Sequence, residues 1–283
     1  MERQNKVYVI GTLAQVKDIR EGEKDGIPWI AGSAVVNSKD SEIEFKFYSS
    51  AKTVAGKDNA RYANYSGLDK LVGTRVKVNG ELSGRVFYNE REGQVINFNE
   101  VTAGFFNSAK PTEEDVSTFE YSGFVTKPLY ERHNKDEELV AYEMEIAQAN
   151  YSGENMQIVR FSVDKDNRKI ISAIESAYTK GTTVSIMGEI EYIVTVIEKT
   201  EEVAFGDPII KKFPSVLKRF LITGGKQPII DEGVAYSAEQ MTKLQSAFND
   251  YVAQIEKEAK ERNSSGTPQK SAPAKSNNAD RLL

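Results

Sequence analysis

The chain contains one sequence motif twice. Residues 70–82 align without a gap with residues 178–190, and both segments contain the frame Gly-Thr-x-Val-x-(Val/Ile)-x-Gly-Glu-(Leu/Ile). An earlier glycine, Gly11 or Gly123, precedes the second glycine of this frame by 69 residues in one copy and by 65 in the other. A repeat of this size spans a whole domain. The 283-residue chain is therefore expected to fold as two similar domains in tandem.

Both halves follow the same series of predicted elements. Apolar and polar side chains alternate in 43–48 and in 75–78, as expected of strands that have one buried face. Each half reads as three strands, a helix and two further strands, which is the order of an OB-fold, a five-stranded barrel. An early glycine suits the sharp bend at a barrel corner. The predicted fold class is all-β with minor helices, with two tandem OB-fold barrels at residues 1–110 and 111–230.

The remaining residues predict a C-terminal helical segment, 231–262, and a disordered tail, 263–283. Ser237 and Gln240 have the spacing of a capping box at the start of an amphipathic helix over 237–262. The apolar stripe of this helix packs either on its own domain or on a partner, such as a second copy in a homodimer. Its members recur at three- and four-residue steps: Met241, Leu244, Phe248, Val252, Ile255 and Ala259. The tail is polar and rich in Ser, Pro and Asn.

The composition excludes several kinds of chemistry. The chain has no cysteine and one histidine, His133, which rules out disulfides, zinc fingers and cysteine nucleophiles. Phosphate-binding loops and nucleophile-elbow motifs are absent, and the carboxylate clusters lie in polar stretches typical of solvated loops. We therefore expect a binding protein, not an enzyme, with no metal and no cofactor.

Nothing in the sequence suggests a membrane protein. No apolar run approaches the roughly 20 residues that a membrane-spanning helix needs, and the first residues lack the apolar core of a signal peptide. The expected location is the cytoplasm.

Charge is distributed unevenly between the two halves. The net charge of -5 divides into +2 for residues 1–110, -6 for 111–230 and -1 for 231–283. Local charge, and not the total, therefore decides what the chain binds. If it binds a polyanion, the first barrel is expected to dominate.

Two segments combine basic and aromatic residues, the combination that holds single-stranded nucleic acid. Residues 70–91 have five basic side chains against two acidic ones, and 208–226 have five basic and no acidic ones. The alternatives are a solvated strand face with its rings in the core for the first segment, and a flap over the barrel mouth for the second. With outward positions on the second and third strands added, the candidate binding residues are Trp29, Lys46, Tyr48, Arg75, Lys77, Arg85, Phe87, Tyr88, Arg91, Tyr142, Arg160, Lys211, Lys212 and Phe213.

The repeated frame, with Gly11-Thr12-Leu13 and Asn99-Glu100-Val101, resembles the single-stranded DNA-binding proteins of bacteria and phages. The resemblance covers 5–105 well and 118–225 more loosely. Two repeats in one chain resemble a phage-type member of the family, whose location would be the cytoplasm of the host bacterium. It implies DNA held on the outer face of strands two and three and on the arm between strands four and five. It also implies a tail that recruits replication or recombination proteins, although the family's acidic Pro-Phe tip is replaced here by Asp-Arg-Leu-Leu.

The sequence therefore predicts a protein of DNA replication, recombination or repair that binds single-stranded DNA, or RNA, largely without sequence preference. The rival prediction is an OB-fold scaffold that binds a polypeptide and has no nucleic-acid role, which the negative net charge favours. Exposed rings beside cations would favour nucleic acid, whereas an apolar groove without cations would favour a peptide.

Overall fold

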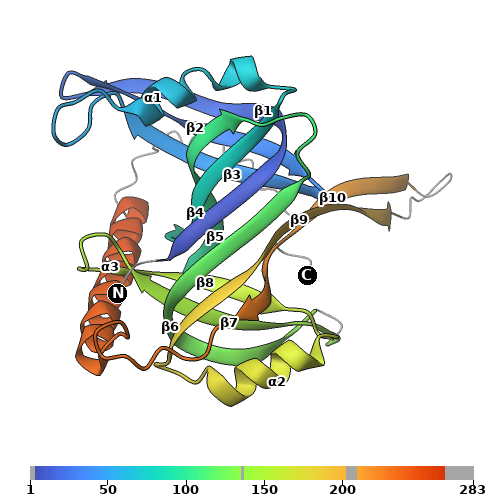
Figure 1. The fold of residues 1–283 in the computed structure, drawn as a ribbon, viewed down its shortest axis with the longest axis vertical. Coiled ribbons are helices and arrows are strands. Elements are labelled where there is room, and N and C mark those ends of the chain that lie inside the picture. The colour runs from blue at the N-terminus through green and yellow to red at the C-terminus, as the bar shows by residue number, and fades with distance from the viewer. Residues whose placement is uncertain (1–3, 135–136, 202–208, 265–283) are drawn as a thin grey trace.

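The computed structural model describes residues 4–134, 137–201 and 209–264 (Figure 1). The first half contains β1 (Asn5–Lys24), β2 (Ile27–Ser38), β3 (Ser41–Ser50), helix α1 (Ala60–Tyr65), the 3-10 turn η1 (Leu68–Leu71), β4 (Arg75–Asn89) and β5 (Gln94–Ser108). The second half contains β6 (Val116–His133), β7 (Leu139–Ala149), β8 (Met156–Val163), helix α2 (Arg168–Ala177), β9 (Thr183–Glu201) and β10 (Ile209–Gly225). Helix α3 (Ala238–Ser264) follows. A mostly-β chain with few helices and a C-terminal helix, as predicted, is confirmed.

The strands of each half pair in a closed circuit. In the first half β1 pairs with β2 and β4, β2 with β3, and β4 with β5, while β3 and β5 close the circuit in parallel. In the second half β6, β7, β8, β10 and β9 pair in the same way, again with one parallel pair, β8 with β10. The repeated sequence has thus folded into repeated topology.

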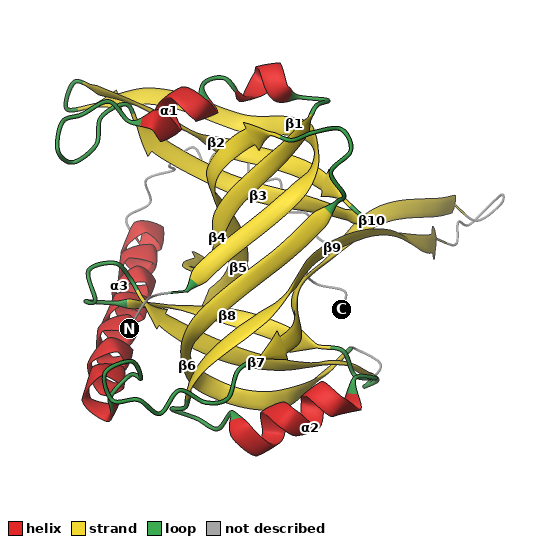
Figure 2. Ribbon diagram, in the orientation of Figure 1, coloured by secondary structure: helices red, strands yellow, loops and turns green. Residues whose placement is uncertain are grey.

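An antiparallel pairing of β1 with β6 joins the two circuits into one ten-stranded sheet. The two strands run side by side through the middle of the molecule (Figure 2). Val7 lies opposite Phe119 at this junction. Val7 also pairs with Gly80, and Phe119 pairs with Gly188, so equivalent positions of the repeat face each other. The halves are therefore related by an approximate two-fold axis through this pair.

A glycine stands where β1 changes partners. Residues of β1 up to Ile10 pair with β6, and residues from Thr12 onward pair with β2. A Cβ atom on Gly11 would lie 2.2 Å from the Asn37 carbonyl oxygen of β2, so only glycine allows this approach. Gly123 occupies the same position on β6, where a Cβ atom would lie 2.1 Å from the Ala147 carbonyl oxygen.

The alternation of side chains on β3 follows the prediction. Ile43, Phe45 and Phe47 are buried in the core of the first half, whereas Lys46 and Tyr48 point away from it. The second half is centred on a cluster of aromatic rings: Phe119, Tyr121, Phe161 and Phe220. Their burial contributes roughly 25 cal/mol per Å² of apolar surface and stabilises both circuits, whose buried residues form one continuous cluster.

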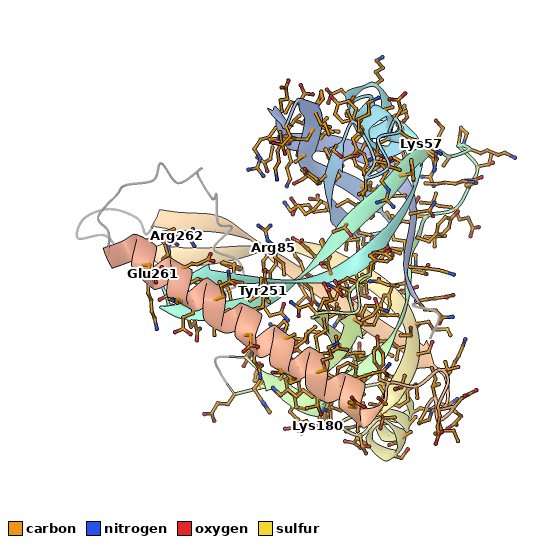
Figure 3. The ribbon with its side chains drawn as sticks, turned by 90° about the vertical axis from the view of Figure 1, so that its left-hand side faces the viewer. Lys57, Arg85, Lys180, Tyr251, Glu261 and Arg262 are labelled. Carbon is orange, nitrogen blue, oxygen red and sulfur yellow. The ribbon has the colours of Figure 1, made fainter. Side chains whose placement is uncertain are left out.

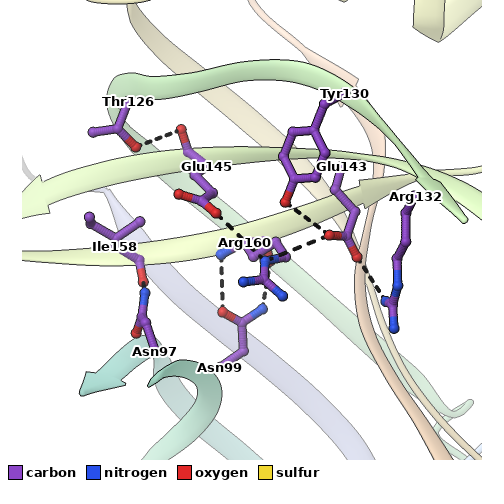
Figure 4. A network of polar contacts seen from close by, with 9 residues as sticks. All are labelled: Asn97, Asn99, Thr126, Tyr130, Arg132, Glu143, Glu145, Ile158 and Arg160. Atoms are coloured by element: carbon purple, nitrogen blue, oxygen red, sulfur yellow. Dashed lines mark hydrogen bonds and ion pairs between the residues drawn. The ribbon is translucent and has the colours of Figure 1, made fainter. Parts of the chain in front are cut away.

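The β4–β5 hairpin of the first half reaches onto β8 of the second. Asn97 donates from its side-chain amide to the Ile158 carbonyl oxygen at 2.9 Å. Asn99 donates to the Arg160 carbonyl oxygen at 2.6 Å and accepts from the Arg160 backbone N–H at 3.0 Å (Figure 4). Gly84 permits the close approach, since a Cβ atom there would lie 1.8 Å from the Ile158 carbonyl oxygen. The hairpin therefore partly covers the outer face of the second half.

Helix α3 packs on the chain itself. Its N-terminus has the predicted capping box: Gln240 N–H donates to Ser237 Oγ at 3.2 Å, and Ser237 N–H donates to Gln240 Oε1 at 2.9 Å. Leu244 and Phe248 are buried against strands of the second half and against Val86 of β4. Packing on its own chain is the first of the two predicted alternatives. Residues 265–283, which include most of the predicted tail, lie outside the described residues.

No helix within the described residues is long and apolar enough to cross a membrane.

Substitution Gly84→Ala is expected to destabilise the protein by about 1–3 kcal/mol, because the new methyl group would overlap the Ile158 carbonyl and force the hairpin off β8. Chemical denaturation measures the change, and limited proteolysis of the hairpin reports its release. Gly67→Ala is the matched control, since its Cβ atom would meet neighbours only at 3.7 Å. Equal stabilities of the two variants would contradict this account of the contact.

Candidate nucleic-acid interface

A groove with a volume of about 1310 Å³ runs along the outer face of the first half, which we call the β3 groove. Strands β1, β2, β3, β4 and β5 all contribute to its walls, and α1 and the β7–β8 loop lie at its edges. Its lining combines five cationic side chains with four aromatic rings and three carboxylates: Lys6, Arg20, Lys46, Arg61, Arg85, Phe47, Tyr48, Phe105, Tyr151, Asp18, Glu81 and Glu100. Cations and rings together suit a strand of phosphates and bases.

Three sequence-predicted residues come together on and beside β3. The Lys46 ammonium group donates to Ser33 Oγ at 2.8 Å and to Glu44 Oε1 at 2.9 Å. Tyr48 is 64% exposed, and its ring centroid lies 6.1 Å from that of Trp29. The Trp29 ring packs against Gly22 of β1, where a Cβ atom would lie 2.6 Å from it. The pair of rings therefore forms a partly exposed platform beside a cation.

Glu44 organises the cations on this face. Burial would raise the pKa of the Glu44 carboxyl, but Lys46, Lys17 and Lys218 together lower it to about 2. Lys17 Nζ lies 3.1 Å from Glu44 Oε1, and Lys218 Nζ, which comes from β10 of the second half, lies 3.6 Å from Glu44 Oε2. One carboxylate thus holds three ammonium groups together at the junction of the two halves.

Four further predicted residues lie on the β4–β5 hairpin. Arg85 is 62% exposed and lies 3.9 Å from Glu100, whose pKa is raised by burial and lowered again in part by Arg85. Phe87 packs edge-on against Phe98. Tyr88 is partly buried, and Arg91 lies exposed at the hairpin tip. These side chains lead away from the β3 groove along the hairpin.

Arg75 and Lys77 lie elsewhere. Arg75 Nη2 lies 2.7 Å from Asp115 Oδ1, and Lys77 Nζ lies 2.8 Å from Glu113 Oε1. Both cations point away from the core as predicted, but they hold the connection between β5 and β6 and are only partly exposed. Neither lines the β3 groove. The sequence segment 70–91 therefore divides into a structural part and a part that faces the groove.

The groove also contains residues that no sequence pattern predicted. The Arg61 guanidinium of α1 lies 5.8 Å from the centre of the Phe105 ring. Tyr151, in the β7–β8 loop of the second half, donates its hydroxyl to Glu81 of β4. No local pattern marks these residues, because the docking of the helix and of the second half brings them to the groove.

The second half lacks the groove residues of the first. Leu13 pairs with Val36 and Val36 with Ile43, and the equivalent pairs are Val125 with Ile146 and Ile146 with Val159. Counting along the chain from these pairs makes Ser162 the counterpart of Lys46, and Asp164, one residue beyond the end of β8, the counterpart of Tyr48. The same count gives Glu143 as the counterpart of Ser33.

The charged side chains of the equivalent face are paired with one another, and the face is partly covered. Glu143 is 3% exposed and accepts from Tyr130 at 3.0 Å and from Arg132 at 2.8 Å (Figure 4). The predicted site residue Arg160 lies 3.6 Å from Glu143 and 3.8 Å from Glu145, and its backbone is bound by the hairpin. Tyr142, also predicted, is partly buried and donates to Glu131 at 3.4 Å. The structure does not bring these two residues to the β3 groove.

Lys211, Lys212 and Phe213 lie on β10, whose backbone pairs with β9 at this point. Their side chains lie outside the described part of the structure. Within the described part, no three His, Cys, Asp or Glu side chains gather as they would around a metal ion.

The chain belongs to the YorF family, whose model matches residues 3–264. No curated protein matches it. The structure is similar to two crystal structures of the single-stranded DNA-binding protein from Thermus aquaticus. For a deletion mutant the TM-score is 0.51 at 15% identity, covering 84% of this chain and 100% of that one. For the wild-type protein the TM-score is 0.49 at 14% identity, and the match covers 84% of this chain and 98% of that one. The first likeness shows a shared fold.

Substitution Glu44→Gln is expected to lower the free energy of unfolding at pH 7 by on the order of 2 kcal/mol, because the carboxylate gains its cation partners only on folding. Since the pKa of Glu44 falls from its usual 4.5 to about 2, this stabilisation is complete above pH 4.5 and is lost as the pH falls toward 2. Denaturation curves at pH 7 and near pH 3 therefore differ in the effect of the substitution. Glu42→Gln, at an exposed position on the same strand, is the control. An equal loss at both pH values would contradict the cation cluster.

Proposed function

We propose that the chain binds single-stranded DNA in the β3 groove of its first half. The observation that carries this proposal is the open groove in which Lys46, Arg61 and Arg85 lie with the exposed rings of Tyr48 and Tyr151. The cations contact phosphates, and the bases stack on the rings of Tyr48 and its neighbours. Such stacking contributes about 1–3 kcal/mol per base and tolerates any base, because every base has a π-face.

We further infer that each circuit of five strands is an OB-type barrel, so that the chain is a tandem of two such domains at 1–110 and 111–230. The closed pairing, the parallel contact of the third and fifth strands and the helical segment before the fourth strand support this inference. The fold shared with a protein described as binding single-stranded DNA supports it as well. OB-folds bind oligonucleotides on the face to which the β3 groove belongs.

The first domain carries the binding in this proposal. Its groove presents Lys46 and Tyr48, whereas the second domain has Ser162 and Asp164 at the equivalent positions, beside the buried Glu143. The arginines of that face are engaged by Glu143 and Glu145, and the β4–β5 hairpin occupies part of it. The second domain supports the groove from one side through its β7–β8 loop.

The rival function, a scaffold for a polypeptide, is less well supported. Five cations line the groove, and the carboxylates Asp18, Glu81 and Glu100 are fewer. Phe87 is exposed beside Arg85, which is the arrangement expected for nucleic acid. By its chemistry the chain would cover single strands exposed during DNA replication, recombination or repair, with no covalent step.

Titration with oligo-dT tests the proposal directly, because Trp29 is the only tryptophan and lies beside Tyr48. We expect tight, salt-sensitive binding with quenching of tryptophan fluorescence, and much weaker binding of duplex DNA of the same length. Oligo-U in the same assay distinguishes DNA from RNA. Absence of binding at low salt would overturn the proposal and favour the scaffold.

Two substitutions separate the contributions of phosphate and base. Lys46→Ala is expected to flatten the dependence of log affinity on log salt concentration by roughly 0.7 for the lost phosphate contact. Tyr48→Ala is expected to cost about 1–3 kcal/mol of binding with an unchanged salt slope, because a stacked ring carries no charge. Fluorescence anisotropy of labelled oligo-dT measures both quantities.

Lys180→Ala is the control, because this exposed lysine lies on the second half, away from Arg85 and the groove (Figure 3). It should change neither quantity. A salt slope that Lys46→Ala leaves intact would remove Lys46 from the interface.

A further inference from the structure

A second hollow, of about 410 Å³, lies between the β4–β5 hairpin and the C-terminal part of α3. The hairpin contributes Arg85, Phe87 and Tyr88, and the helix contributes Tyr251 and Arg262. Figure 3 shows Tyr251 and Arg262 on α3, with Arg85 close to Tyr251. Phe87 is 38% exposed and Tyr251 is 43% exposed. The hollow therefore presents rings and guanidinium groups from two separate elements.

Arg85 connects this hollow with the β3 groove, since its side chain lines both. A strand that occupies the groove and passes Arg85 therefore enters the hollow without leaving the protein surface. The remaining lining is apolar, from Val86, Ile255 and Ala259, and among the described residues that line the hollow Glu90 is the only acid. With two guanidinium groups and one carboxylate, the residues that line the hollow carry a net positive charge.

Charge distinguishes two candidate occupants of the hollow, the segment that follows α3 in the sequence and a nucleic-acid strand. Residues 265–283, which follow α3, contain Lys270, Lys275 and Arg281 against Asp280, so this segment is itself cationic. A cationic segment is repelled by Arg85 and Arg262, whereas a phosphodiester strand is attracted by them. Rings beside guanidinium groups also suit a nucleotide, because bases stack on both.

We infer that the hollow is a second nucleic-acid subsite, in which Tyr251 stacks on a base and Arg262 contacts a phosphate of the strand that leaves the β3 groove. This inference rests on the proposed function and extends it, because it assigns α3 a direct part in binding. It makes affinity depend on oligonucleotide length: a short strand fills only the groove, and a longer one reaches the hollow as well.

Anisotropy titrations of the full chain with oligo-dT of about 6 and about 16 nucleotides test the inference. The wild type is expected to bind the longer strand more tightly. The double variant Tyr251→Ala, Arg262→Ala is expected to lose roughly ten-fold in affinity for the longer strand, from one lost stacking contact, with the affinity for the short strand unchanged. Its salt slope for the longer strand should fall by roughly 0.7 for one phosphate.

Two variants serve as controls. Lys257→Ala removes a 75% exposed cation of the same helix that does not line the hollow, and it should bind both strands like the wild type. Tyr251→Phe keeps the ring and should retain the affinity for the longer strand. Circular dichroism melting verifies that α3 remains folded in every variant.

The outcomes separate this inference from the proposed function. If the wild type binds neither strand, the proposed function is wrong. If the wild type binds the short strand but the double variant keeps its full affinity for the longer one, the second subsite is wrong and the β3 groove stands. Equal losses for both strand lengths would also overturn the subsite, because they would place the effect in the groove.

Discussion

The arrangement of this molecule depends on how β1 divides its hydrogen bonds. The first part of β1 pairs with β4 on one side and with β6 on the other. Beyond Gly11, β2 takes the place of β6 as its partner. Glycine allows this change of partner, because β2 passes where a side chain would stand. The same exchange occurs at Gly123 on β6. Through these two changes of partner, the strands of each half form a closed circuit, and the first part of β1 can still pair with the first part of β6.

Once the halves are joined in this way, the remaining contacts follow from geometry. Because the halves are related by an approximate two-fold axis, each packs a hairpin on the other. The β4–β5 hairpin of the first half contacts β8, and β9 and β10 of the second half contact β3. Lys218 thereby reaches Glu44, and the β7–β8 loop brings Tyr151 to Glu81. The groove therefore has lining residues from both halves, although all five of its cations come from the first. Helix α3 then packs across the seam between the hairpin and the second half.

Much of this could be predicted where a local pattern was sufficient. Alternation correctly placed Phe45 and Phe47 inside and Lys46 and Tyr48 outside, and the spacing of Ser237 and Gln240 marked the start of α3. Contacts between residues that are far apart in the sequence could not be predicted. The ion pairs that engage Arg75 and Lys77 come from a connection more than thirty residues further along the chain. The carboxylates around Arg160 become its neighbours only through strand register.

The presence of both halves in one polypeptide has an evolutionary consequence. In a symmetric homodimer every substitution appears twice, so a residue that weakens one ligand-binding face weakens the other equally. Here the equivalent positions differ: the counterpart of Lys46 is Ser162, and the counterpart of Ser33 is Glu143. A substitution in the joined chain therefore changes one face without changing the other.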